Sequence, residues 1–204
     1  MVGAAPIPPG TIERPVLTFP AAEAAWVRQV YDGARVILEY GSGGSTVLAG
    51  EMLGATVFSV ESDRDWVENM RAWFEENPPL ADVRLHPVDI GRTRAWGHPA
   101  GNANWRQFHK YPISVWDRPD FRHPDVVLID GRFRAACLLT ALFRIERPVT
   151  VLFDDYVGRK PYKAVETFAE PVETRGRMVR FDLEPRRFPP AEMGRIMEIF
   201  TRAQ

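Results

Sequence analysis

The sequence predicts a doubly wound α/β fold: a mostly parallel sheet of about seven strands with helices on both faces and an antiparallel C-terminal strand. Two observations predict it. Short runs such as Val36–Tyr40 and Val149–Phe153 are almost continuously apolar, which is typical of strands buried on both faces of a sheet. Helical segments separate these runs, and parallel strands need such crossover connections.

The elements follow one another in a regular order. Pro20 can open a first helix, because the apolar residues after it recur at spacings of three and four. Strands are expected next at residues 36–40, 56–60, 82–86, 125–130 and 149–153. The helices between them are expected to begin at Ser45 or Thr46, after Glu61, and at Arg134, the last of these running to position 145.

The C-terminal part differs from this alternation. Residues 178–183 alternate as a strand but lack a preceding crossover helix of the same quality, which predicts an antiparallel, hairpin-like finish. A terminal helix follows, and its spacing predicts that four apolar residues face inward: Met193, Ile196, Met197 and Phe200.

Length and composition limit the classes of protein. The 204 residues suit one domain, expected over 21–204, after an extended lead-in over 1–20 that holds five of the 18 prolines. A net charge of −1 argues against a polycation that binds nucleic acid. No apolar run is long enough to span a membrane, and the start lacks the pattern of a secretory signal, so a cytoplasmic protein is expected. The single Cys137 excludes a disulfide within the chain.

The turn after the first strand is the candidate ligand site, because such sheets bind ligands beyond the carboxyl ends of their strands. Gly41-Ser-Gly-Gly44 is expected to leave the backbone bare for a ligand. Glu61 ends the next strand, 18 residues beyond Gly43, where a carboxylate can accept from two ribose hydroxyls. A dinucleotide fingerprint would have Gly or Ala in place of Thr46, and Glu39 would repel a pyrophosphate. A nicotinamide-dependent oxidoreductase is therefore the less favoured alternative.

These residues resemble the class I S-adenosylmethionine-dependent methyltransferases. Glu39-x-Gly41-x-Gly43 is similar to the first motif of that family, Glu61 to its acidic second motif, and 88–90 to its adenine-contacting segment. The third alternating glycine that is frequent in the family is absent here. The resemblance implies S-adenosylmethionine as cofactor and a binding site formed by Glu39, Gly41, Ser42, Gly43, Ser45, Glu61, Ser62, Asp89, Ile90 and Asp130.

Three carboxylates end the fourth and fifth expected strands. Asp130 and the pair Asp154-Asp155 should converge at one edge of the sheet, and oxygen ligands favour Mg²⁺ or Mn²⁺. The arrangement resembles the divalent-metal O-methyltransferases, in which the metal binds the acceptor hydroxyl. Two departures are that Asp155 stands where those enzymes commonly have Asn, and that no lysine follows Asp130. The alternative is that these acids only cap the turns that follow.

The long connection 87–124 is expected to select the substrate. It holds three of the six tryptophans, which predicts a lid or wall over the cleft. Between positions 92 and 134 there are eight basic residues and four acids, which favours an anionic acceptor; the alternative is a satellite core with solvated arginines. Candidates for moving a proton are His98, His109 and Asp130.

The sequence thus predicts methyl transfer to an oxygen or nitrogen of a small molecule, with neither nucleic acid nor membrane as partner. The alternative from another class is a non-catalytic protein that binds S-adenosylmethionine or a nucleotide.

Overall fold

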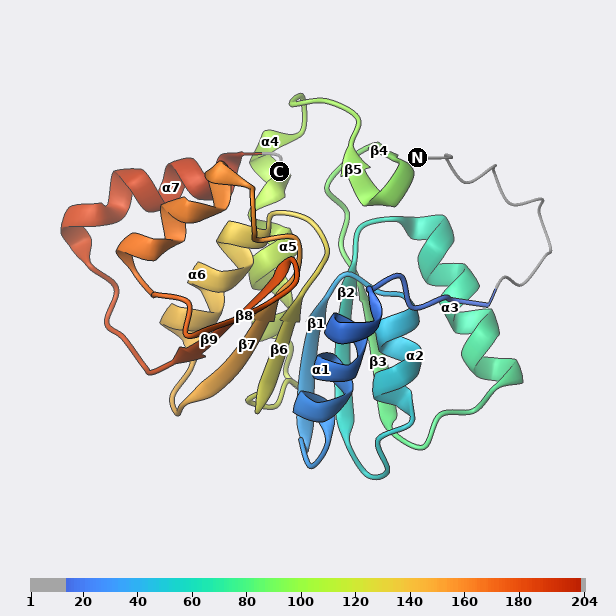
Figure 1. Cartoon of the computed structure of the whole chain (residues 1–204). Coiled ribbons are helices and arrows are strands. Elements are labelled where there is room, and N and C mark those ends of the chain that lie inside the picture. Colours follow the sequence, from blue (N-terminus) through green and yellow to red (C-terminus); the bar gives the residue numbers. More distant parts are fainter. Residues whose placement is uncertain (1–13, 203–204) are drawn as a thin grey trace.

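The computed structural model describes residues 14–202 (Figure 1). The expected lead-in lies outside the described residues as far as position 13, and residues 14–20 form neither helix nor strand. A seven-stranded sheet of order β3-β2-β1-β6-β7-β9-β8 forms the centre of the fold. The predicted α/β fold class is confirmed.

Five strands of the sheet run parallel and two run antiparallel to their neighbours. The parallel strands are β1 (Val36–Tyr40), β2 (Thr56–Glu61), β3 (Asp82–Pro87), β6 (Val126–Ile129) and β7 (Val149–Phe153). The antiparallel finish consists of β8 (Glu173–Arg175) and β9 (Met178–Leu183), and β9 pairs with β7. The strand order reverses between β1 and β6, where such folds bind ligands.

Helices cover both faces of the sheet because successive strand residues point to opposite sides. Ile37 packs in one cluster with Trp26 of α1 (Ala21–Tyr31) and with α2 (Gly44–Gly50). Leu38 packs in the other cluster with Leu138 of α6 (Arg134–Arg144). The longest helix, α3 (Arg64–Glu76), contacts β2 and β3.

The terminal helix α7 (Met193–Thr201) corrects one expectation. Its buried residues are Ile196 and Ile199, whereas Met193 and Met197 are 50% and 62% exposed. Two overlapping apolar stripes at helical spacing share Ile196 and Phe200, so periodicity alone did not distinguish them. The stripe with two isoleucines packs in the same cluster as α6.

The connection 87–124 folds into small elements above and behind the sheet. A hairpin of β4 (Thr93–Arg94) and β5 (His98–Pro99) encloses a 3₁₀ turn, η1 (Ala95–Gly97). Then come α4 (Trp105–Phe108), α5 (Lys110–Ile113) and a second 3₁₀ turn, η2 (Ser114–Asp117). A third 3₁₀ segment, η3 (Lys160–Thr167), follows β7, and a fourth, η4 (Pro190–Glu192), precedes α7.

Buried polar contacts attach this connection to the sheet. The Tyr40 hydroxyl donates to the Pro112 carbonyl at 2.6 Å and accepts from Nε1 of Trp116 at 2.7 Å. Of the three tryptophans in the connection only Trp116 is buried, whereas Trp96 and Trp105 are 71% and 45% exposed. The segment is therefore part core and part exposed rim. None of the helices within residues 14–202 combines the length and the apolar character that crossing a membrane requires.

Candidate functional site

In the glycine turn after β1, an added Cβ would have space at one glycine and would collide with backbone atoms at the other two. Gly41 has a φ of +103°, and a Cβ added there would lie 2.7 Å from the backbone nitrogen of Gly131. A Cβ on Gly44 would collide with the backbone of Leu17. A Cβ on Gly43 would meet no atom within 4 Å. The expectation of bare backbone along the whole turn is therefore wrong: Gly41 and Gly44 allow close backbone packing, and only Gly43 faces open space.

Hydrogen bonds of buried hydroxyl groups hold the glycine turn in place. Glu39 is fully buried and accepts from the Tyr31 hydroxyl at 2.6 Å and from the Ser59 hydroxyl at 3.4 Å. Oγ1 of Thr46 accepts from the backbone N–H of Gly43 at 3.0 Å and lies 3.0 Å from the Ser59 hydroxyl. Glu39 is thus linked to the glycine turn through Ser59 and Thr46.

Burial raises the pKa of Glu39, while hydrogen bonds from Thr46, Tyr31, Ser45 and Ser59 oppose the rise. Protein hydroxyls surround its two oxygens. Ser45 is itself buried, whereas Ser42 is only partly buried and its hydroxyl lies 2.7 Å from that of Ser59. This geometry supports a role for Glu39 in ordering the loop.

Glu61, at the end of β2, points toward the glycine turn. Its Oε2 accepts from the backbone N–H of Ser42 at 3.2 Å, and its Oε1 accepts from Ser62 at 2.6 Å and from Asp63 at 2.9 Å. Burial raises the pKa of the carboxyl, and the backbone hydrogen bonds lower it. The structure therefore places this carboxylate against the turn at Ser42, the residue before Gly43.

The β4–β5 hairpin lies over this carboxylate. Gly97 has a φ of +67°, and a Cβ there would lie 2.7 Å from Oγ of Ser62 and 2.9 Å from Oε1 of Glu61. The Ser62 hydroxyl donates to the Gly97 carbonyl at 3.1 Å. The substrate-side connection thus closes directly on two of the expected cofactor residues.

Two further expected contacts follow β3. Asp89 is exposed, and its Oδ1 accepts from the backbone N–H of Gly91 at 2.8 Å. Ile90 is only 1% exposed and belongs to the core. The exposed carboxylate is free to reach a ligand on its second oxygen, whereas the Ile90 side chain packs inward.

The three carboxylates at the ends of β6 and β7 meet as expected, and arginines accompany them. Asp130 lies 3.1 Å from Nη2 of Arg134. Asp154 is fully buried and receives both Nε and Nη2 of Arg177, at 3.1 and 2.9 Å.

Asp155 completes the set. It pairs with Arg159 at 2.7 Å and with Arg177 at 3.2 Å. Within residues 14–202 no group of three or more His, Cys, Asp or Glu side chains is arranged to hold a metal ion. The expected Mg²⁺ or Mn²⁺ site is therefore not supported, because guanidinium groups already neutralise the acids.

The pKa of the Asp130 carboxyl is nevertheless shifted from its ordinary value. Burial raises the pKa of Asp130 to about 7, with Asp154 and Asp155 adding to the rise and Arg134 opposing it. At neutral pH this carboxyl is therefore close to half-protonated, which suits a group that exchanges a proton.

A basic rim adjoins Asp130. Nη1 of Arg132 lies 2.5 Å from Nε2 of His98, and Nε of Arg132 is a buried donor with no hydrogen-bond partner. Burial and then the charges of Arg132, Arg94, Arg134 and Arg159 lower the pKa of His98. His98 is therefore held neutral at a strongly positive edge.

His109 does not join this group. It lies at the junction of α4 and α5, is exposed, and its side chain forms no hydrogen bond with any described residue. The structure brings together two of the three residues that the sequence suggested for proton transfer, Asp130 and His98, through the Arg132 and Arg134 side chains between them.

One solved structure decides the family. A methyltransferase-like protein from Silicibacter pomeroyi is 49% identical to this chain, with a TM-score of 0.88, and the match covers 92% of this chain and 98% of that one. The chain belongs to the class I S-adenosylmethionine-dependent methyltransferase superfamily.

More distant members of the superfamily share the fold. The O-methyltransferase TomG of tomaymycin synthesis from Streptomyces achromogenes, solved with S-adenosylmethionine, is 17% identical over 81% of this chain and 82% of its own, at a TM-score of 0.56. An O-methyltransferase from Bacillus cereus, solved with S-adenosylhomocysteine, is 15% identical at a TM-score of 0.52, and the match covers 81% of this chain and 84% of that one. No protein-family model and no curated protein sequence matches the chain.

For a member of this superfamily, two residues that sequence reasoning missed stand out. Arg134 is 5% exposed and donates to the carbonyls of Gly131 at 3.0 Å and Asp154 at 2.6 Å, so it joins the ends of β6 and β7. Trp66 of α3 donates from Nε1 to the Ser42 carbonyl at 2.9 Å. The spacing of Asp130 and Arg134, one helical turn, was the available signal for the first of them.

Proposed function

We propose that this chain transfers a methyl group from S-adenosylmethionine to an oxygen or nitrogen of a small anionic molecule. The observation that carries the proposal is that Glu61 accepts from the Ser42 N–H at 3.2 Å, next to Gly43, where an added Cβ would meet no atom within 4 Å. A carboxylate at the end of β2 can accept from two ribose hydroxyls, and bare backbone at the first turn admits the rest of a nucleoside ligand.

The donor set fits that cofactor. Oε2 of Glu61 has only one protein partner, the N–H of Ser42 at 3.2 Å, so it can accept from a ribose hydroxyl. Asp89 at the end of β3 has a free carboxylate oxygen for the adenine side. Asp130, beyond β6, would face the methionine part. When bound, the cofactor would supply an electrophilic methyl group on a sulfonium, for transfer in line to the lone pair of an acceptor with S-adenosylhomocysteine as the leaving group.

This chain would then handle the proton that the acceptor releases. Asp130 has a pKa raised to about 7 and lies next to Arg134, which stabilises its charged form. His98 is neutral and faces Arg132. In its deprotonated form, either side chain can accept the proton of a hydroxyl or an ammonium group.

An anionic acceptor is supported by the charge balance at the rim. Arg134, Arg159 and Arg177 already compensate the three acids at the ends of β6 and β7. Arg94 and Arg132 form no ion pair with an acid within residues 14–202, and Nε of Arg132 has no acceptor. A carboxylate or phosphate on the acceptor would supply the missing negative charge and the missing hydrogen-bond acceptor.

The first test is calorimetry with S-adenosylhomocysteine and, separately, with NADH. We expect the first ligand to bind and the second not to bind. Gly43→Val should abolish binding, because its side chain fills the open space above the turn, whereas Gly101→Val is the matched control, since Gly101 also faces open space but lies in the connection. Binding of NADH alone, or full affinity in Gly43→Val, would contradict the proposed cofactor site.

The second test follows the formation of S-adenosylhomocysteine over a panel of acceptors. The panel pairs phenolic and amino acceptors that carry a carboxylate with their neutral amides, and it includes an RNA oligonucleotide. We expect turnover of the acceptors that carry a carboxylate. In Arg132→Gln, the turnover of these acceptors should fall more than the turnover of their neutral amides. Cofactor binding without turnover of any acceptor would favour the non-catalytic alternative, and turnover of RNA would contradict a small-molecule acceptor.

A further inference from the structure

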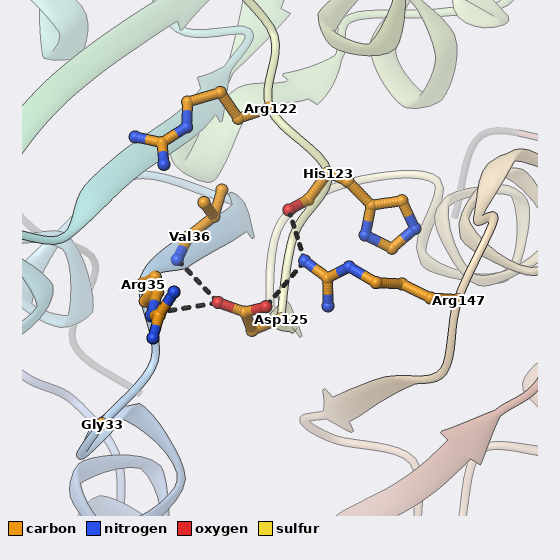
Figure 2. Close-up of a pocket in the computed structure, with 7 residues that line it drawn as sticks. All are labelled: Gly33, Arg35, Val36, Arg122, His123, Asp125 and Arg147. Atoms are coloured by element: carbon orange, nitrogen blue, oxygen red, sulfur yellow. Dashed lines mark hydrogen bonds and ion pairs between the residues drawn. The ribbon is translucent and has the colours of Figure 1, made fainter.

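A second pocket lies at the opposite end of the sheet from the glycine turn. It has a volume of about 590 Å³ and is formed where the chain enters β1, β6 and β7, by residues that include Arg35, Arg122, Asp125 and Arg147 (Figure 2). Because β1 has five residues, about 16 Å of strand separates this pocket from the proposed cofactor site. The pocket is therefore independent of the proposed methyl transfer.

The one acid in the pocket is fully engaged. Oδ2 of Asp125 accepts from the backbone N–H groups of Arg35 at 2.9 Å and Val36 at 3.0 Å. Its Oδ1 lies 2.7 Å from Nη2 of Arg147, which also donates to the His123 carbonyl at 3.1 Å. Figure 2 shows these contacts, and Arg147 and Asp125 together are electrically neutral.

His123 adds no charge to this balance. Its Nε2 accepts from the backbone N–H of Glu146 at 2.9 Å, so its Nδ1 is the nitrogen that carries the proton and donates to the Pro124 carbonyl at 2.9 Å. Both ring nitrogens are therefore used, and the ring is held in its neutral form.

Two guanidinium groups remain without a counter-charge. The Arg35 side chain lines the pocket and forms no hydrogen bond or ion pair with any described residue (Figure 2). Arg122 donates from Nη1 to the Thr56 hydroxyl at 2.8 Å and has no acidic partner within residues 14–202. Asp125 and Arg147 neutralise each other, so the lining carries a net charge of +2 from Arg35 and Arg122.

We propose that this pocket binds the phosphate dianion of a small molecule. Two uncompensated guanidinium groups match a dianion in charge, whereas a carboxylate would neutralise only one of them. The planar guanidinium fork also matches the oxygens of a phosphate. The pocket is concave and within the size range of small-molecule sites. The chain as a whole carries a net charge of −1, which does not suit a nucleic-acid backbone.

Calorimetry on the full chain at constant ionic strength tests the site with inorganic phosphate, glucose 6-phosphate and acetate as probes. We expect both phosphates to bind and acetate not to bind. Tighter binding of the sugar phosphate would identify a phosphomonoester as the preferred ligand, and equal affinity would identify free phosphate. Absence of binding for both phosphates at millimolar concentration would overturn the proposal.

Substitutions locate the binding. Arg35→Gln and Arg122→Gln should each lower the affinity for phosphate roughly tenfold, because each removes a charged hydrogen-bond donor. The double variant should lose phosphate binding. Arg187→Gln is the control, since Arg187 is exposed and away from the pocket. All variants should keep the affinity for S-adenosylhomocysteine. Unchanged phosphate affinity in the double variant, or tighter binding of an RNA oligonucleotide through the same arginines, would overturn the proposal.

Discussion

Nη2 of Arg134 lies 3.1 Å from Oδ1 of Asp130, at the edge of the sheet where the sequence suggested a divalent metal. The same arginine reaches the Asp154 carbonyl at 2.6 Å and Oδ2 of Asp155 at 3.8 Å. A cation is therefore needed at this edge to balance the clustered carboxylates, and the chain provides it from its own side chains. At this edge the charge of the clustered carboxylates is therefore balanced by arginine side chains.

The first prediction concerns metal. Because each of the three acids is already paired with an arginine, we expect Mg²⁺, Mn²⁺ or EDTA to change neither the melting temperature nor the turnover of an active acceptor. Thermal unfolding with and without each addition measures the first quantity. A rise in melting temperature that saturates with Mg²⁺ and disappears in Asp155→Asn would contradict the expectation and restore the metal site.

The second prediction concerns Arg134 itself. Arg134→Met should lower the free energy of unfolding by about 3 kcal/mol, because it leaves Asp130 without its arginine partner and removes the hydrogen bond to the Asp154 carbonyl. Urea unfolding measures the loss. Arg187→Met is the control, since Arg187 is exposed and forms no hydrogen bond with any described residue. Equal stability of the two variants would show that Arg134 does not hold the strand ends together.

The fold was predictable because its signals are local. Buried parallel strands have apolar runs as their signal, and β1 and β7 begin and end where the sequence placed them. The antiparallel strand β9 has an alternating pattern, and its bounds were also predicted. The orientation of α7 was not predictable, because Met197 and Ile199 lie on overlapping stripes and only the packing against α6 decides between them.

The site was predictable where one residue type is needed at a strand end. Glu61 and the three aspartates fall where parallel strands must place them. The partners of these acids come from elsewhere in the chain: Arg177 lies in the turn between β8 and β9, and Gly97 lies in the hairpin. Such contacts between distant segments depend on loop geometry, which no periodic pattern reports.

The third prediction uses the contact between the hairpin and Glu61. Gly97→Ala places a Cβ 2.9 Å from Oε1 of Glu61 and 2.7 Å from Oγ of Ser62, at a backbone φ of +67°. The hairpin must shift, so we expect the affinity for S-adenosylhomocysteine to fall about tenfold and stability to fall by about 1 kcal/mol.

Gly101→Ala is the matched control for that variant. It lies in the same connection, and a Cβ there meets nothing within 4 Å. Its affinity and stability should equal those of the unchanged chain. If both alanine variants bound S-adenosylhomocysteine equally well, the hairpin would not form part of the cofactor site.

The last prediction concerns the pH dependence of stability. His86 in β3 lies 2.9 Å from the Ser114 hydroxyl and 3.3 Å from Nη1 of Arg118, and burial followed by the charge of Arg118 lowers its pKa from 6.5 to about 4. Between these values the unfolded chain binds a proton that the folded chain does not bind. The stabilising contribution is therefore complete above pH 6.5 and is lost as the pH falls toward 4. After allowance for solvent screening, the loss should be about 1–2 kcal/mol.

Urea unfolding at pH 7 and pH 5 measures this contribution in His86→Gln. Because glutamine does not titrate, the variant should lose less stability than the unchanged chain between the two pH values. His109→Gln is the control, since His109 is exposed and its side chain has no hydrogen-bond partner among the described residues. It should keep the full pH dependence. If His86→Gln kept the same dependence as the control, protonation of His86 would not be the cause, and the carboxylates would have to account for it.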